Sequence, residues 1–256
     1  MLKGIDVSRW QGHIDTAQVA QQGYSFGIVE AQYGTDTPNP LFREQYDGFK
    51  AVGMVCGAYQ YALPGHASAQ AHVHAFVDVV TQFDGLPPVL DIEVTDGLDD
   101  IKLIAWCREW ANATHVIDRR KPILYASAAF IKEHGLTALF DTFLLWLADY
   151  ESETPTEFAW TFWQHSPTGV VAGIQAEVDL NVFHGSVIDL IRLCSPTVIY
   201  DPVHIQINGE KQDQDGLMIQ DNTFVSWTSL RALDDKIEAI PTGEKPYGYN
   251  FTTKRG

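Results

Sequence analysis

The chain has 256 residues, of which 45% are hydrophobic, and its 33 acidic and 17 basic residues give a formal net charge of −16. Nucleic acid and anionic membranes would repel a chain of this charge, so we expect neither as a partner. No apolar stretch is long enough to span a bilayer, which excludes membrane insertion by a helix. The length suits one large domain and one small domain.

Apolar runs bounded by Gly, Pro or Asp predict eight strands, and several of the intervening segments have helical spacing. The strands are expected at residues 2–7, 25–31, 54–62, 88–93, 122–126, 143–148, 159–164 and 176–180, and the helices at residues 40–51, 68–83, 99–117 and 128–134. This alternation favours a parallel β/α barrel or a doubly wound sheet. No glycine-rich nucleotide-binding motif follows a strand, which disfavours the doubly wound sheet. Because little helix separates the last three strands, we expect an α/β fold with a distorted or incomplete TIM-like β/α barrel.

The pattern changes at residues 195–197, a short break that contains a proline. We therefore expect a barrel domain over residues 1–194 and a small α+β module over residues 195–256. The module's strands are expected at residues 203–208, 216–219 and 223–226, and its helix at residues 230–240. A unit of this size can bury only a small core of its own.

The most informative motif is Asp91-Ile92-Glu93, which follows a Pro-Pro pair and a short apolar run. Residues two apart in a strand project from the same face, so Asp91 and Glu93 present two carboxyl groups side by side. Glycoside hydrolysis requires such a pair, one protonated to donate to the leaving oxygen and one ionised to stabilise or attack the sugar cation. The same motif also occurs in metal sites and ordinary turns.

Other predicted strands also end in acidic, amide or aromatic residues, at the rim where β/α barrels build their active sites. These residues are Asp6, Glu30, Tyr59, Tyr61, Tyr125, Asp149, Gln164 and Asp179. Carboxylates on one rim raise one another's pKa, which is unfavourable unless a site uses them. A strand-end cap or a salt bridge explains any single one of them. It does not explain Asp6, Asp91, Glu93 and Asp179 together.

Several short motifs, in order along the chain, resemble the family-25 glycoside hydrolases, the Chalaropsis-type lysozymes. They are Gly4-Ile5-Asp6-Val7-Ser8, Trp10-Gln11-Gly12, Ile14-Asp15, Gly57-Ala58-Tyr59, Leu90-Asp91-Ile92-Glu93, Leu145-Trp146-Leu147-Ala148, Trp163-Gln164 and Val178-Asp179-Leu180-Asn181. The resemblance implies an N-acetylmuramidase that cleaves the β-1,4 bond of bacterial peptidoglycan with net retention and lyses cells. It implies neither a metal nor another cofactor.

By the same resemblance, Glu93 is the general acid and Asp91 is its partner carboxylate, and Asp6 and Asp179 complete the acidic cluster. One of the other carboxylates could attack the anomeric carbon, or the substrate's own acetamido group could do so with an Asp to orient it. Two positions depart from the family pattern. The family more often has His-Phe where this chain has Gln60-Tyr61, and it usually has Lys or Arg near the place of Glu30.

Aromatic rings at the strand ends are expected to bind sugars, because the C–H face of a pyranose packs against an aromatic face as an apolar group does. The expected substrate-binding residues are Tyr59, Tyr61, Tyr125, Trp146 and Trp163, with the polar Asp149 and Gln164 beside them. Trp106 and Trp110 lie four residues apart in a predicted helix, so we expect both in the core.

Metal-dependent and serine hydrolases are the competing classes of enzyme. His72 and His74 fall in a predicted helix, where side chains two residues apart point about 200° apart and cannot share one metal. We expect both histidines to face solvent. No G-x-S-x-G motif of a nucleophilic serine is present. The three cysteines are expected to be free thiols, buried in the case of Cys56 and Cys107.

Residues 205–209 and 223–232 are faintly similar to a stalk-like repeat named after copper amine oxidase N-terminal domains. That similarity implies a wall-binding or oligomerisation module and no copper. No signal peptide is visible, so we expect a phage-endolysin-like enzyme made in the bacterial cytoplasm, with secretion as the alternative. The competing functions are a catalytically inactive wall-binding protein and a glycosidase of different specificity, such as a chitinase.

Overall fold

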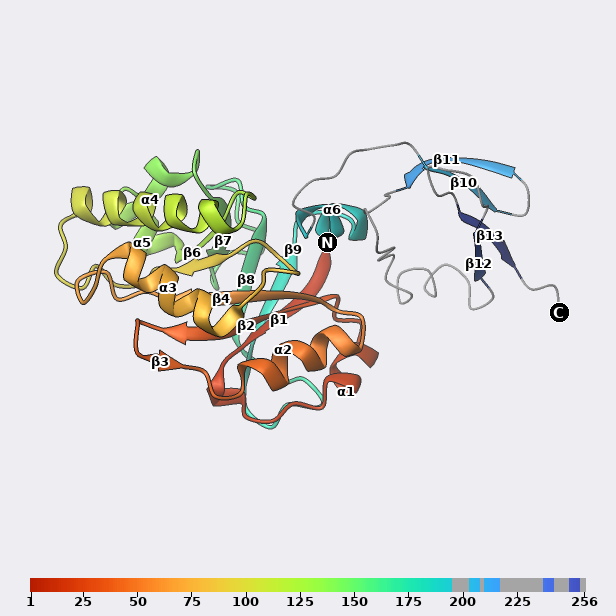
Figure 1. Cartoon of the computed structure of the whole chain (residues 1–256), viewed down its shortest axis with the longest axis horizontal. Helices are drawn as coiled ribbons and strands as arrows, with labels where there is room; N and C mark the ends of the chain where they lie inside the picture. The colour runs from red at the N-terminus through yellow and green to blue at the C-terminus, as the bar shows by residue number, and fades with distance from the viewer. Residues whose placement is uncertain (195–202, 208–209, 217–236, 242–248, 254–256) are drawn as a thin grey trace. The chain divides into compact units, whose positions relative to one another are not determined.

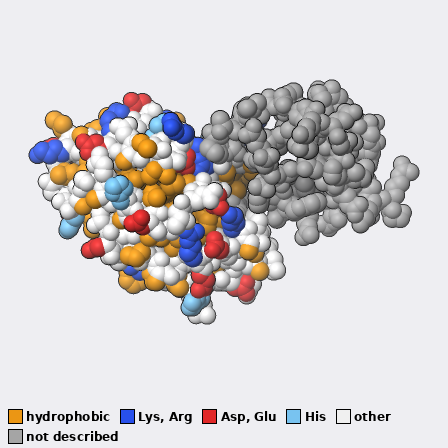
Figure 2. Space-filling model, in the orientation of Figure 1, with side chains coloured by type: hydrophobic (Ala, Val, Ile, Leu, Met, Phe, Trp, Pro, Cys, Tyr) orange, Lys and Arg blue, Asp and Glu red, His pale blue; other side chains and the backbone are white. Residues whose placement is uncertain are grey.

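The computed structural model describes residues 1–194 and, beyond them, four strands at residues 203–207, 210–216, 237–241 and 249–253. Contacts within the chain divide it into two compact units, Met1–Pro196 and Thr197–Gly256. No helix among the described residues combines the length and the hydropathy needed to cross a membrane. On the visible face of the first unit, basic and acidic side chains are interspersed with apolar ones (Figure 2).

Eight strands of the first unit close into a barrel in the order β1-β9-β8-β7-β6-β5-β4-β2, and β2 pairs back with β1. Their bounds are β1 (Leu2–Val7), β2 (Phe26–Tyr33), β4 (Val55–Tyr61), β5 (Val89–Asp91), β6 (Ile123–Ser127), β7 (Leu144–Ala148), β8 (Phe162–Gly169) and β9 (Val178–Phe183). All neighbours are parallel except that β9 runs antiparallel to both β8 and β1. A short strand, β3 (Thr37–Pro38), adds to the outer edge of β2. The expected TIM-like barrel is thus confirmed, closed but distorted by one reversed strand.

Helices lie outside the strands in the connections from β1 as far as β7 (Figure 1). They are the 3-10 helix η1 (Arg9–Gln11), α1 (Thr16–Gln21), α2 (Phe42–Ala51), α3 (Ala69–Val80), α4 (Asp100–Ile117), α5 (Ala128–Glu133) and the 3-10 helix η2 (Leu136–Leu139), with α6 (Val187–Leu193) after β9. Several helices begin at Ser or Asp residues whose side chains accept the N–H three residues on, namely Ser68, Asp99, Ser127 and Ser186. This capping explains why α3, α4 and α5 begin within one residue of the predicted positions.

Alternation along the strands divides the core into two layers. Side chains inside the barrel include Phe26, Ile28, Val89, Ile123 and Phe162. The layer between strands and helices includes Val29, Leu90, Leu124, Phe76 and Trp110. Trp106 and Trp110 are 7% and 0% exposed, which confirms the expectation that they belong to the core. All three cysteines are free thiols, and Cys56 and Cys107 are buried as expected.

The expectation that His72 faces solvent was wrong, because its side chain is completely buried while His74 is exposed. Nδ1 of His72 donates to the Ser68 carbonyl at 3.1 Å, and Nε2 accepts the amide N–H of Leu63 at 3.2 Å. Burial lowers the pKa of His72. The imidazole of His72 is therefore neutral and has one fixed tautomer, in which it hydrogen-bonds the Ser68 carbonyl and the Leu63 amide.

In the second unit, the strands β10 (Val203–Ile207), β11 (Glu210–Gly216), β12 (Ile237–Pro241) and β13 (Tyr249–Thr253) form one sheet in the order β11-β10-β13-β12. Residues 237–240 were expected as the end of a helix but belong to β12, because their backbone pairs antiparallel with β13. The other expected elements, at residues 217–219, 223–226 and 230–236, lie outside the described residues.

Candidate active site

Four carboxyl groups meet at the rim formed by the carboxyl ends of the parallel strands. Asp6 lies near the end of β1, Asp91 ends β5, and Glu93 follows two residues later. Asp179 is the second residue of β9, and the reversal of this strand brings its beginning to the same rim. Asp6 and Asp179 are direct neighbours in the β1–β9 pairing. The structure therefore brings together all four carboxyl groups that the sequence assigned to the cluster.

Asp6 and Asp179 form a hydrogen-bonded carboxyl pair. Asp6 is 5% exposed, and its Oδ2 accepts hydrogen bonds from Gln164 Nε2 at 2.8 Å and Asn181 Nδ2 at 2.7 Å. Burial, followed by the charge of Asp6, raises the pKa of the more exposed Asp179 to about 8. Two carboxyl groups in contact cannot both ionise without strong repulsion. At neutral pH this pair therefore shares one proton and carries one negative charge.

Asp91 and Glu93 form a second hydrogen-bonded carboxyl pair, in which Asp91 is buried and Glu93 is exposed. Asp91 is 6% exposed, and its Oδ1 has no hydrogen-bond partner among the described residues, whereas Glu93 is exposed. Burial and then the charge of Glu93 raise the pKa of Asp91 well above its ordinary value. Partial shielding also raises the pKa of Glu93, while the hydrogen bond with Asp91 lowers it. Burial and repulsion between the two carboxyl groups therefore favour a proton shared between buried Asp91 and exposed Glu93.

Two side-chain amides hold Asp6 in place, and aromatic residues fix their orientation. Oε1 of Gln164 accepts hydrogen bonds from Tyr125 Oη at 2.8 Å and Tyr150 Oη at 2.6 Å, and Oδ1 of Asn181 accepts Trp146 Nε1 at 2.8 Å. Each amide oxygen is thus occupied by a donor, so its NH₂ group points at Asp6. Asn181 and Tyr150 were not singled out from the sequence, although Asn181 shares a strand face with Asp179.

Tyr125 and Trp146 were expected to stack on sugars, and the structure places both rings beneath the rim, 8% and 2% exposed. Their centroids lie 4.7 Å apart in an edge-to-face contact, and Tyr59 meets Trp146 edge-on at 6.4 Å. Burial, followed by the charges of Asp6 and Glu30, raises the pKa of Tyr59 well above its ordinary value. These three rings therefore form the floor under the carboxyl groups.

A more accessible aromatic surface lies beside the Asp91–Glu93 pair. Tyr61 stacks on Tyr33 with ring centroids 4.7 Å apart and planes 9° apart, and Tyr33 is 39% exposed. Tyr61 pairs with Asp91 in the β4–β5 register, and burial and then the charges of Glu93 and Asp91 raise the pKa of Tyr61. Tyr33, which the sequence analysis missed, extends the expected sugar-binding wall outward.

Asp149 and Trp163 belong to the connection between β7 and β8 and the start of β8. The Asp149 carboxylate accepts hydrogen bonds from the amides of Glu151 and Ser152 and from Ser152 Oγ. Nε1 of Trp163 donates to the Asp149 carbonyl at 2.7 Å. Both residues therefore shape the loop at this side of the rim, and a contact of either with substrate stays a prediction.

The two departures from the family pattern have structural explanations. Glu30 is 5% exposed, and its Oε1 accepts both Nη2 and Nε of Arg9, at 2.7 and 3.0 Å. Glu30 is therefore the salt-bridge partner of Arg9 in η1. Gln60 points away from the rim, because its amide group hydrogen-bonds Gly34, His72 and Trp110.

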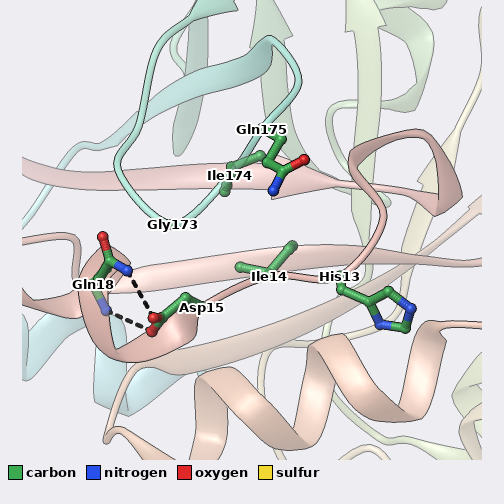
Figure 3. A pocket seen from close by; sticks show the side chains of 7 residues that line it. All are labelled: His13, Ile14, Asp15, Gln18, Gly173, Ile174 and Gln175. Carbon is green, nitrogen blue, oxygen red and sulfur yellow. Dashed lines mark hydrogen bonds between the residues drawn. The ribbon is translucent and has the colours of Figure 1, made fainter.

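A separate hollow of about 450 Å³ lies between the β1–α1 and β8–β9 connections (Figure 3). Its lining residues are His13, Ile14, Asp15, Gln18, Gly173, Ile174 and Gln175. The Asp15 amide donates to the Gly173 carbonyl at 2.9 Å, and the Asp15 carboxylate is engaged by Gln18. None of the four carboxyl groups of the cluster lines this hollow. Among the described residues, no three or more His, Cys, Asp or Glu side chains are arranged to hold a metal ion.

Comparison with known proteins decides the family. Residues 5–174 match the family described as Glycosyl hydrolases family 25. The chain belongs to this family. The protein YegX of Escherichia coli K12, described as uncharacterized, is 34% identical over 197 residues, 74% of this chain and 72% of its own length. Lysozyme M1 of Streptomyces globisporus is 30% identical over 215 residues, 77% of this chain and 72% of its own.

Among solved structures, the bacterial lysozyme from Streptomyces coelicolor matches with a TM-score of 0.71 at 30% identity, over 75% of this chain and 96% of that one. This family-25 protein is therefore a glycoside hydrolase of the lysozyme type, and the resemblance seen in its motifs is confirmed. The similarity of residues 205–209 and 223–232 to a stalk-like repeat stays a prediction.

Proposed function

We propose that this family-25 hydrolase cleaves the β-1,4 bond between N-acetylmuramic acid and N-acetylglucosamine in bacterial peptidoglycan and thereby lyses cells. The observation that supports this most is the arrangement of Asp91 and Glu93. A buried and an exposed carboxyl group lie in hydrogen-bond contact at the rim, and burial raises the pKa of both. General acid catalysis near neutral pH requires a carboxyl group that keeps its proton.

In the proposed mechanism, Glu93 takes up the proton of the pair as substrate binds and donates it to the glycosidic oxygen. The Asp6–Asp179 pair supplies one negative charge for the oxocarbenium-like transition state. Asp179 is the more exposed member and would face the sugar, while Asp6 positions it. Either an Asp carboxylate attacks the anomeric carbon, or it orients the substrate's acetamido group to do so. Water then returns a proton to the Asp91–Glu93 pair, and both routes give retention.

Digestion of purified cell walls, followed by borohydride reduction and mass spectrometry, tests this proposal. We expect muropeptides that end in muramitol, because the cleaved bond leaves N-acetylmuramic acid as the new reducing end. Glu93→Gln should lower the rate by about 10²–10⁴-fold, the usual contribution of general acid catalysis, without unfolding the protein. The matched control Glu109→Gln makes the same change at an exposed position of α4 and should leave the rate unchanged.

Three results would contradict the proposal. Glucosaminitol ends would assign the enzyme a different specificity. A Glu93→Gln variant that digests walls at the wild-type rate would remove Glu93 from the mechanism. Activity lost in EDTA and restored by Zn²⁺ would replace the two-carboxyl mechanism with metal-dependent hydrolysis.

A further inference from the structure

Trp10 is 79% exposed, the largest exposed fraction among the Phe, Tyr and Trp residues that the structure describes. Tyr150 and Tyr33 follow at 49% and 39%, and the other described tryptophans are buried or partly buried. An isolated exposed apolar residue is ordinary on a protein surface. The backbone around Trp10 and its place on the barrel set this residue apart.

The backbone on both sides of Trp10 is fixed. Ser8 Oγ accepts the Trp10 amide at 3.2 Å, and the Ser8 amide donates to Gln11 Oε1 at 2.8 Å, which forms a capping box around η1. The buried Gln45 side chain donates to the carbonyls of Ser8 and Gly12, both at 2.9 Å. Trp10 is therefore displayed by a rigid turn, which reduces the conformational entropy lost when a ligand binds to it.

The turn lies across the rim of the active site. It begins two residues after β1 ends, and β1 carries Asp6. On one side, Arg9 is bound to Glu30 of β2 and to the Thr37 carbonyl. On the other side, Gln11 Nε2 donates at 2.9 Å to the carbonyl of Glu177, two residues before Asp179. Trp10 therefore stands beside the mouth of the site that holds the Asp6–Asp179 pair.

We propose that Trp10 is a stacking platform for a sugar ring of the glycan strand that lies beyond the four sugars centred on the cleaved bond. This inference rests on the proposed function for the identity of the strand. The C–H faces of pyranose rings pack on aromatic faces as apolar groups do, and Trp10 presents such a face to solvent. The lining of the neighbouring hollow includes the imidazole of His13 but no Phe, Tyr or Trp, so Trp10 presents the large aromatic face beside it.

The test compares long and short substrates of the full-length enzyme. The long substrate is a set of peptide-free glycan strands prepared from purified walls, and the short one is a tetrasaccharide of two disaccharide units. For Trp10→Ala, we expect the ratio of kcat/KM on strands to kcat/KM on tetrasaccharide to fall about tenfold, through KM. Trp10→Phe, which keeps an aromatic ring, should restore most of the ratio.

Val116→Ala is the matched control, since Val116 is 77% exposed and lies near the end of α4, on the opposite side of the barrel from the rim. It should leave the ratio unchanged. An unchanged ratio in Trp10→Ala would overturn the inference. So would an equal loss on both substrates, because the ring would then act on one of the four central sugars or in folding.

A binding assay separates this inference from the proposed function. Co-sedimentation with the same strands in a Glu93→Gln background measures binding without cleavage. We expect Trp10→Ala to weaken the Kd about tenfold in that background. If the wild-type enzyme cleaves no peptidoglycan but strand binding depends on Trp10, the proposed function fails and the inference stands. If the wild-type enzyme cleaves peptidoglycan and Trp10→Ala leaves the Kd for glycan strands unchanged, the inference fails and the proposed function stands.

Discussion

At the scale of single residues, burial gives chemically similar side chains different roles. Asp6 and Asp91 are almost completely buried, while Asp179 and Glu93 face the open side of the rim. Each buried carboxyl group is paired with an accessible one, and each pair shares a proton. The barrel thus presents two groups to a substrate and keeps a second carboxyl group behind each of them.

The pKa of Asp179 predicts how stability depends on pH. Its pKa is raised to about 8 in the folded protein from an ordinary value of 3.8. The folded state therefore binds this proton more tightly than the unfolded state, and the stabilisation is complete below about pH 4 and is lost as pH rises towards 8. Asp179→Asn removes the carboxyl group whose ionisation destabilises the folded state as pH rises. The free energy of unfolding of the variant should therefore increase relative to that of wild type between pH 5 and pH 8.

Urea unfolding midpoints at several pH values measure this difference. Asp47→Asn, at an exposed position of α2, is the control and should keep the wild-type pH dependence. Midpoints of Asp179→Asn that follow the wild-type curve at every pH would show that Asp179 ionises normally in the folded protein.

The sequence predicted part of this site because strand periodicity places Asp91 beside Glu93. The same periodicity places Asn181 beside Asp179, so this residue could have been found. Strand periodicity could not identify Arg9, Tyr33 or Tyr150. Each of them contacts a residue on another element, and the contact depends on how the elements pack. The Arg9–Glu30 salt bridge, for example, spans 21 residues and depends on the β1–β2 pairing.

At the scale of elements, the reversal of β9 is the feature that completes the site. The β8–β9 hairpin brings Gln164 and Asn181 into register with each other, and both donate to Asp6. The sequence carried a signal for this reversal. Only residues 170–177 separate β8 from β9, which is too short for the crossover that two parallel strands require. Strands β2, β4, β5, β6 and β7 follow helix-containing connections, and β8 follows the longer helix-free connection of residues 149–161; all of them are parallel, as predicted.

Close packing inside the barrel predicts a strong effect at Gly4. Gly4 pairs with Phe26 in the β1–β2 register, and a Cβ at Gly4 would lie 2.2 Å from the Phe26 ring, which is completely buried. We expect Gly4→Ala to destabilise the protein by about 1–3 kcal/mol, the usual cost of overpacking a core. Chemical denaturation measures this change.

The double variant Gly4→Ala with Phe26→Leu separates overpacking from a loss of backbone freedom. If the clash with the ring causes the loss, the smaller side chain should make the double variant more stable than simple addition of the two single effects. Additive losses would show that the ring already moves aside.

At the scale of the whole molecule, the chain combines a catalytic unit that has its own two-layer core with a second unit built around a small sheet. The contact boundary at residues 196–197 lies close to the proline-containing break in the sequence. We propose that the second unit binds the cell wall or joins copies of the chain. Neither role requires a change at the rim of the barrel, because both roles act by raising the local concentration of enzyme at its substrate.

A protein that ends at Ser195 tests this role. It should hydrolyse soluble muropeptides at the full-length rate, because every residue of the candidate site lies between Asp6 and Asn181. On intact cells it should act more slowly, since tethering increases effective concentration without altering the chemistry. Light scattering distinguishes the two roles: a lower oligomeric state after truncation indicates assembly, and an unchanged state with lost sedimentation on walls indicates wall binding. Equal rates on intact cells with no change in assembly would assign the second unit neither role, and a loss of activity on soluble fragments would show that the barrel depends on it.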